Sequence, residues 1–346
     1  MKTYKNLYNN IWDFQNLLKS YYAARKRKND KDYVINCEWN LERELLEIKK
    51  EIQEKNYQPS VYQKFFVSDP KRRLVYVASF RDRIVHHALC NIIEPIFDKG
   101  FIFDSYACRK NKGTHRAVMR LKNFLRSLYF KCGSDNFYIL KCDVRKFFDS
   151  VDKEILFALI KKKIKDKDVL WLIKKILDST EGSKGIPIGN LTSQLFANIY
   201  LNELDQFVKH NLRIKYYARY MDDFVVLSND KKQLKIWREF IKEFLANSLR
   251  LDLHPQKQEI FPARIGVDFL GFHIFYSHIL IRKSMIRRFW KKFKKGRLDN
   301  KSFWSYLGHL EFADWWGFKK KIENKMPFVY NQSFCNFYGQ RTANFS

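Results

Sequence analysis

Two adjacent carboxylates between two apolar, β-prone runs constrain this sequence more than any other feature. Asp222 and Asp223 stand between residues 216–221 and 224–227, a pattern that predicts a β-hairpin with the acids at its turn. Neighbouring carboxylates repel each other unless a cation neutralises them, and oxygen ligands suit a hard ion such as Mg²⁺. An isolated Asp-Asp pair is most often a solvated turn, so the interpretation depends on the rest of the chain.

A third carboxylate is expected from another strand. Residues 137–142 form a short, mainly apolar run that ends at Asp143. If this run pairs with the edge of the hairpin, Asp143 joins Asp222 and Asp223. Three such carboxylates would complete a two-metal site.

The charge balance indicates a polyanionic partner. Lys and Arg number 66 against 37 Asp and Glu, which gives a formal net charge of +29 over 346 residues. Such an excess favours nucleic acid. Aromatic residues make up 17% of the chain, and aromatics interleaved with cationic side chains supply stacking platforms beside phosphate contacts. A soluble basic surface without such a partner is the less favoured interpretation.

The cysteines and the apolar runs bear on the compartment. The six cysteines show no C-x-x-C pair and no regular spacing, which argues against a zinc knuckle or a disulfide framework and fits a reducing compartment. No run approaches the roughly 18 apolar residues of a membrane span. We therefore expect a cytoplasmic protein with no membrane partner.

Hydrophobic spacing predicts a mixture of helices and strands. Apolar residues at helical spacing predict helices at 11–27 and 41–52, ahead of a strand-turn-strand unit at 61–77. Further helices are predicted from residue 81 to near Pro95, at 114–129, after Asp152, at 195–208 and at 236–249, and a second hairpin at 267–275. The basic, aromatic segment from about residue 282 is expected to be a helical module that grips a duplex backbone.

Three segments contain candidates for nucleotide binding. The first strand-turn-strand unit has a basic turn at 69–73, and a guanidinium such as that of Arg73 can bind phosphate through two parallel hydrogen bonds. Phe148 follows Asp143 closely and offers a flat ring to a nucleotide sugar, or else packs in the core. The small turn at 186–194 precedes a helix, where donors can approach a base or phosphate.

Residues 67–275 resemble a reverse transcriptase of the bacterial, group II intron-like lineage, with the family's motifs in the same order. Tyr220-Met221-Asp222-Asp223 looks like the family's Y-x-D-D box, and residues 143–149 look like its first acidic box. The resemblance implies a right-hand polymerase of the α+β class, with fingers, palm and helical thumb. It implies RNA-directed DNA polymerase activity in a bacterial or phage-encoded protein. The partners would be template RNA, a primer or cDNA strand and deoxynucleoside triphosphates.

The resemblance also implies roles for individual residues. The ligands of two Mg²⁺ ions, with Mn²⁺ as an alternative, would be Asp143, Asp222, Asp223 and the backbone carbonyl of Val144. Lys257 would protonate the leaving pyrophosphate, and Phe148 would exclude a ribose 2′-OH. The substrate-binding residues would be Arg73, Arg109 (in an S-Y-x-x-R loop), Phe148, Ile188, Gly189 and Gln194. The nucleic-acid contacts would be Phe269, Leu270 and Gly271 of a primer grip, and Arg287, Arg288, Lys291 and Lys292 of the thumb.

One departure from the family pattern is informative. Most members carry Q-G-x-x-x-S-P before the helix, whereas residues 188–194 read I-G-N-L-T-S-Q. This form, with residues 81–87 and 112–115, resembles the reverse transcriptases of diversity-generating retroelements. Those enzymes copy a template-repeat RNA with errors at adenines, for transfer to a variable repeat, and usually work with a small basic accessory protein.

The resemblance implies a division of the chain and leaves alternatives open. The expected parts are an N-terminal helical extension at 1–60, fingers at 61–136, a palm at 137–275 with a fingers-side insertion near 180–194, and a thumb at 276–346. We expect no maturase or endonuclease extension after residue 346, an expectation that disfavours intron mobility. The alternatives are a retron-type or phage-defence reverse transcriptase, a non-catalytic RNA-binding palm scaffold and a template-independent nucleotidyltransferase. Intact acids argue against the scaffold.

Overall fold

The structure, a computed structural model, describes residues 2–68, 72–296, 300–314 and 316–325. The chain forms two compact units, each assembled from segments that are distant in sequence. The larger unit combines Met1–Ala117 with Tyr138–Phe261, and the smaller unit combines Val118–Phe137 with Pro262–Ser346.

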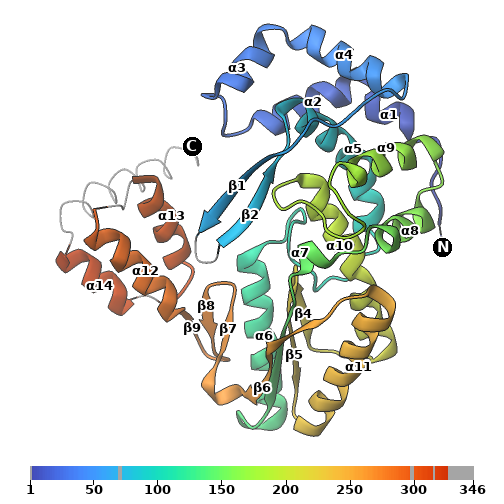
Figure 1. Cartoon of the computed structure of the whole chain (residues 1–346). Coiled ribbons are helices and arrows are strands. Elements are labelled where there is room, and N and C mark those ends of the chain that lie inside the picture. The colour runs from blue at the N-terminus through green and yellow to red at the C-terminus, as the bar shows by residue number, and fades with distance from the viewer. Residues whose placement is uncertain (1, 69–71, 297–299, 315, 326–346) are drawn as a thin grey trace, which may run out of the picture. The chain divides into compact units, whose positions relative to one another are not determined.

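Helices and strands are mixed in the larger unit (Figure 1). Its helices are α1 (Tyr8–Trp12), α2 (Phe14–Arg25), α3 (Asp32–Trp39), α4 (Leu41–Gln53), α5 (Phe80–Asp98), α7 (Phe147–Ser150), α8 (Lys153–Lys163), α9 (Lys167–Asp178), α10 (Leu191–Gln206) and α11 (Lys231–Leu249). Its strands are β1 (Gln63–Ser68), β2 (Arg72–Val77), β3 (Tyr138–Val144), β4 (Tyr217–Tyr220), β5 (Asp223–Ser228) and β6 (Leu253–Pro262).

A four-stranded sheet lies at the centre of the larger unit, with strand order β4-β5-β3-β6. Strands β4 and β5 form the predicted hairpin, and β5 pairs antiparallel with β3. Successive residues of β3 and β5 are buried, including Ile139, Leu140 and Val225, Val226. Their continuous apolar runs suit strands that are covered on both faces.

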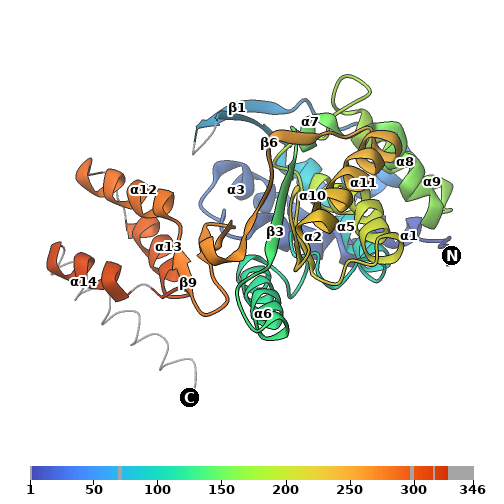
Figure 2. The ribbon, with the colours of Figure 1, turned by 90° about the horizontal axis from the view of Figure 1, so that it is seen from below.

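Two helices cover this sheet differently. Helix α10 is buried almost all round, which is typical of an interior helix. Helix α11 instead buries one stripe, Leu234, Ile241, Leu245 and Leu249, and packs it against β3 and β5. Figure 2 shows α10 and α11 on the same side of β3.

Several predicted helix limits were wrong. Helices α10 and α11 begin at Leu191 and Lys231, earlier than the predicted residues 195 and 236. The helix predicted at 11–27 is divided into α1 and α2 at Asp13, whose carboxylate accepts from the N–H groups of Gln15 and Asn16 and caps α2. Helix α5 continues through Pro95 to Asp98. A proline removes one helical hydrogen bond, and the buried apolar residues on either side of it outweigh that loss.

The first strand-turn-strand unit is confirmed as the antiparallel ribbon β1–β2, with Val67 opposite Arg73. Part of its predicted basic turn, residues 69–71, lies outside the described residues. The ribbon is exposed along β1 and half-buried along most of β2.

The smaller unit contains helix α6 (Thr114–Cys132), which starts within the larger unit, and a three-stranded sheet. The remaining elements are β7 (Val267–Phe269), β8 (Phe272–Ile274), β9 (Ile279–Ile281), α12 (Lys283–Lys294), α13 (Asn300–Leu310) and α14 (Trp316–Lys325). Strands β7 and β8 form the second predicted hairpin. Phe289 of α12 is 1% exposed, and its ring meets those of Phe303 on α13 and Phe318 on α14.

The mixture of helices and antiparallel strands confirms the α+β class. The expected limits of fingers, palm and thumb stay a prediction, since the two compact units group the segments differently: β7 and β8 belong with the C-terminal helices. No helix in the described part of the chain combines the length and the apolar character needed to cross a bilayer.

Candidate active site

The three predicted carboxylates lie where β3 ends and β5 begins. Asp143, on β3, is directly opposite Asp223 in the antiparallel register. Asp222 stands in the turn between β4 and β5, where Met221 has a left-handed φ of 55°. The N–H of Val144 donates to the Asp222 carbonyl at 3.2 Å, which ties this turn to the end of β3. The backbone therefore brings the three acidic residues together.

Charge on Asp222 is costly at this position. Burial raises the pKa of Asp222 above its ordinary value, and the neighbouring Asp223 adds to that rise. The guanidinium groups of Arg73 and Arg219 oppose the shift in this pKa because each favours the charged carboxylate. Asp143 is itself only 7% exposed. A bound cation would relieve the repulsion among these carboxylates.

Lys257 forms an ion pair with the Asp143 carboxylate. It lies on β6, the edge strand next to β3. The sequence did not predict this strand, because Pro255 lies inside it. An edge strand tolerates proline, since one of its sides needs no ladder hydrogen bonds. The role of Lys257 as proton donor to pyrophosphate stays a prediction.

The donor set at this strand edge fits a hard divalent ion. Within the described part of the chain, no three His, Cys, Asp or Glu side chains converge as a ready metal cage. Mg²⁺ does not require one, because it usually binds through one or two carboxylates together with water and substrate phosphates. Carboxylate oxygens also suit Mn²⁺. The assignment of Asp143, Asp222, Asp223 and the Val144 carbonyl as metal ligands stays a prediction that this chemistry supports.

The ribbon β1–β2 and the loop before α10 are joined through their backbones. The N–H of Tyr76, on β2, donates to the Ile188 carbonyl at 2.9 Å. Gly189 has a φ of 120°, and a Cβ added there would lie 2.6 Å from the Tyr76 carbonyl oxygen. Only glycine therefore allows this close approach. Arg73, Ile188 and Gly189 belong to one connected part of the larger unit.

Arg109 is engaged within its own loop. Its Nε donates to the Asp98 carboxylate at 2.6 Å, and its Nη1 donates to the carbonyls of Ile102 at 2.7 Å and Ser105 at 2.9 Å. The side chain is only 8% exposed. These contacts give Arg109 a structural role in the loop between α5 and α6. Its contact with substrate stays a prediction.

Phe148 and Gln194 are both half-buried. Phe148 lies in the short helix α7, with its ring 5.4 Å from that of Phe147 in an edge-to-face arrangement. Gln194 lies in the first turn of α10, where its N–H donates to the Asn190 carbonyl at 3.3 Å. Half-burial leaves part of each side chain available to a nucleotide, and the substrate roles of both stay predictions.

The predicted nucleic-acid contacts lie in the smaller unit. Phe269, at the end of β7, is 1% exposed. Its ring therefore packs in the core and does not offer a surface to nucleic acid. Leu270 and Gly271 form the β7–β8 turn, with φ values of 52° and 91°. On α12 the four predicted phosphate-binding side chains divide into an exposed pair, Arg287 and Lys291, and a half-buried pair, Arg288 and Lys292.

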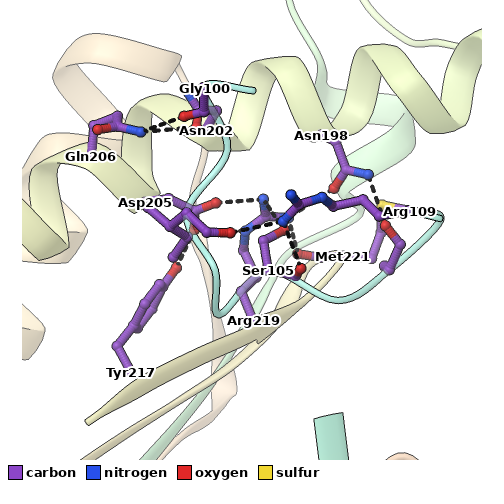
Figure 3. Close-up of polar contacts among 12 residues, drawn as sticks. Gly100, Ser105, Arg109, Asn198, Asn202, Asp205, Gln206, Tyr217, Arg219 and Met221 are labelled. Carbon is purple, nitrogen blue, oxygen red and sulfur yellow. Dashed lines mark hydrogen bonds and ion pairs between the residues drawn. The ribbon is translucent and has the colours of Figure 1, made fainter. Parts of the chain in front are cut away.

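Sequence reasoning missed a fully buried ion pair beside the hairpin. The side chains of Arg219, on β4, and Asp205, on α10, are both 0% exposed. Two hydrogen bonds of 2.7 and 2.6 Å join them (Figure 3). The hydroxyl of Tyr217 donates to the same carboxylate at 2.7 Å. The sequence does contain a signal for this pair, because Arg219 lies within an apolar strand. A buried arginine needs a carboxylate to neutralise its charge.

Known proteins share this sequence pattern. A family described as "Reverse transcriptase (RNA-dependent DNA polymerase)" matches residues 64–274, more than half of the chain. The chain is 28% identical over 283 residues to Protein YkfC of Escherichia coli (strain K12), covering 69% of this chain and 72% of that protein. It is 24% identical over 306 residues to the group II intron-encoded protein LtrA of Lactococcus lactis subsp. cremoris, covering 67% of this chain and 50% of LtrA. The chain therefore spans about half the length of LtrA.

A solved structure shows the same fold. The apo telomerase of Candida tropicalis matches with a TM-score of 0.51 and 12% sequence identity, over 66% of this chain and 49% of that chain. At this identity the likeness concerns the fold alone, and it agrees with an α+β polymerase architecture.

Proposed function

The chain belongs to the reverse transcriptase (RNA-dependent DNA polymerase) family, and we propose that it copies RNA into DNA with Asp143, Asp222 and Asp223 as its catalytic carboxylates. The observation that carries this proposal is the sheet register, which sets Asp143 opposite Asp223 and next to the turn that holds Asp222. The net charge of +29 supports a nucleic-acid substrate.

In the proposed reaction, the primer 3′-hydroxyl gives its proton to water and its oxygen attacks the α-phosphorus of a deoxynucleoside triphosphate. The new phosphodiester bond forms as the bond from the α-phosphorus to the bridging oxygen breaks, and pyrophosphate leaves. Mg²⁺ held by the three carboxylates would supply Lewis-acid activation of the hydroxyl and neutralise charge on the phosphates. Arg73 would bind the triphosphate through its guanidinium, and Phe148 would exclude a ribose 2′-OH. Lys257 would pass from the Asp143 carboxylate to the leaving pyrophosphate and donate a proton to it.

The finer part of the proposal is that the enzyme serves a diversity-generating retroelement. Its support is the I-G-N-L-T-S-Q stretch at 188–194. The Ile188 side chain offers only apolar contact where the wider family has a glutamine, so the nascent base pair loses one polar restraint. Weaker restraint narrows the difference in transition-state stabilisation between correct and incorrect nucleotides. Preference for errors at adenines and a small basic accessory protein follow from the resemblance alone.

Primer extension on a mixed-sequence RNA, followed by sequencing of the products, tests both parts. We expect the purified full-length chain with Mg²⁺ to make DNA whose sequence follows the template, and to make none when template is omitted. With the accessory protein supplied if synthesis requires it, errors should concentrate opposite template adenines. Ile188→Gln should reduce those errors because it restores a hydrogen-bonding side chain.

Each contrary result has a distinct meaning. DNA synthesis without template would indicate a template-independent nucleotidyltransferase. RNA binding without synthesis would indicate a scaffold. Template-directed synthesis with errors spread evenly over the four template bases would discard the diversity-generating assignment, favour a retron-type or phage-defence enzyme, and leave the reverse transcriptase standing.

A further inference from the structure

A buried polar network links the β4–β5 hairpin to helix α10 and to the loop at 104–107 (Figure 3). Arg219 is its centre, and each nitrogen of its guanidinium has an acceptor. Besides both Asp205 oxygens, the acceptors are Asn198 Oδ1 at 3.3 Å, Ser105 Oγ at 3.0 Å and the Met221 carbonyl at 3.0 Å. The network therefore uses the full hydrogen-bonding capacity of one arginine.

One of these contacts reaches the turn that contains Asp222. Met221 directly precedes Asp222, and its left-handed φ of 55° is a conformation that a bulky L-residue keeps only when surrounding contacts hold it. Nη1 of Arg219 holds the Met221 carbonyl, and the N–H of Val144 holds the Asp222 carbonyl. The turn is thus fixed by two donors, one from β4 and one from β3.

The position of Arg219 is itself fixed at the backbone. Its N–H donates to the Asp104 carbonyl at 2.9 Å, and its carbonyl accepts from the N–H of Tyr106 at 3.0 Å. Asn198 of α10 also donates to the Ala107 carbonyl at 2.8 Å. The loop at 104–107 and helix α10 therefore fix the position of Arg219, and Arg219 in turn fixes the turn that contains Asp222.

Stability alone is a weak reason to bury this pair. Removing two charges from water costs about as much as their attraction returns, and apolar replacements are often equally stable. The planar guanidinium differs from an ammonium or an apolar group because it donates in several fixed directions at once. We propose that Arg219 is a positioning residue that sets the backbone of the Met221–Asp222 turn, so that Asp222 presents its carboxylate to the metal. This inference rests on the proposed function.

The test compares Arg219→Lys with Tyr217→Phe in the full-length chain. Lysine keeps a positive charge near Asp205 but cannot reach all the acceptors. Tyr217→Phe removes a buried hydrogen bond to the same carboxylate while leaving every donor of Arg219 in place. Mn²⁺ is titrated into each protein, and its binding is followed by the loss of the free-ion electron paramagnetic resonance signal. The Asp222→Asn variant measures Mn²⁺ binding that does not depend on Asp222. The Mg²⁺ dependence of single-turnover extension and the thermal midpoint are measured in parallel.

We expect Arg219→Lys to weaken Mn²⁺ binding and raise the half-saturating Mg²⁺ concentration by about tenfold, the lower end of the effect when a group that orients a metal ligand is lost. Template–primer affinity should stay unchanged. Tyr217→Phe should lower the thermal midpoint without altering either metal dependence. A folded Arg219→Lys protein with wild-type metal dependence would overturn the proposal, as would equal shifts in both variants.

Ser105→Ala keeps the test decisive if Arg219→Lys does not fold. It removes one acceptor of Nη2, which still donates to Asp205, so no buried charge is left unpaired. A smaller change in the same direction supports the positioning role, and no change refutes it. Since the Mn²⁺ titration needs no template, a wild-type protein that binds Mn²⁺ through Asp222 yet copies no RNA would refute the proposed function separately.

Discussion

At the scale of single residues, Gly189 shows how closely the loop before α10 approaches strand β2. The sequence predicted a small turn at 186–194 ahead of a helix. It did not show that the Tyr76 carbonyl would lie 2.6 Å from any Cβ at residue 189, because β2 is far away along the chain. The same limit applies to Arg219, whose acceptor on Ser105 is 114 residues distant. Residue types at the site were predictable, whereas their contacts depended on long-range packing.

Replacing Gly189 with alanine should destabilise the protein by roughly 2–4 kcal/mol, since the new methyl group meets strain at positive φ and a clash with the β2 backbone. Gly113→Ala is the matched control, because its φ is 104° but nothing lies within 4 Å of an added Cβ. The control should cost only about 1 kcal/mol. Urea unfolding measures both, and equal losses would contradict the close approach at Gly189.

At the scale of helices and strands, the sequence predicted most elements, missed helices α3 and α9, and misjudged two elements that contain proline. The strands β3 and β5 are apolar runs that meet an acid at one end, so their pairing and the meeting of Asp143 with Asp223 followed from the pattern. Strand β6 was not predicted and α5 was predicted too short, in each case because of a proline. The proline in β6 is tolerated because β6 is an edge strand, and the proline in α5 is compensated by its buried apolar neighbours.

Helix α12 gives a prediction at this scale, because its cationic side chains differ in exposure. Arg287→Ala with Lys291→Ala removes the exposed pair, and each lost phosphate contact should lower the slope of log affinity against log salt concentration by roughly 0.7–0.9. Arg288→Ala with Lys292→Ala is the comparison pair, half-buried, with Lys292 Nζ 5.9 Å from the centre of the Tyr306 ring. We expect the exposed pair to change the slope more. An unchanged slope would mean that this face of α12 does not bind the backbone.

At the scale of the whole molecule, charge and family pattern indicated a nucleic-acid polymerase, while the assembly of the chain was not predictable. The excess of 66 basic over 37 acidic residues indicated the class of partner. The grouping of residues 118–137 with the C-terminal segment depends on contacts between distant parts of the chain, which no local period encodes. The order of the motifs along the chain thus indicates the function, whereas the fold determines the geometry of the site.

The most direct measurement is single-turnover incorporation of one deoxynucleotide on an RNA template by Asp143→Asn, Asp222→Asn and Asp223→Asn variants. Asp252→Asn is the control, since that carboxylate is exposed just before β6 and lies outside both acidic motifs. We predict that each of the three site variants loses incorporation while binding template–primer as the wild type does, because the carboxylates hold the metal and the basic surface holds the backbone. The control should keep full activity. Wild-type incorporation by any of the three variants would contradict the assignment of this site.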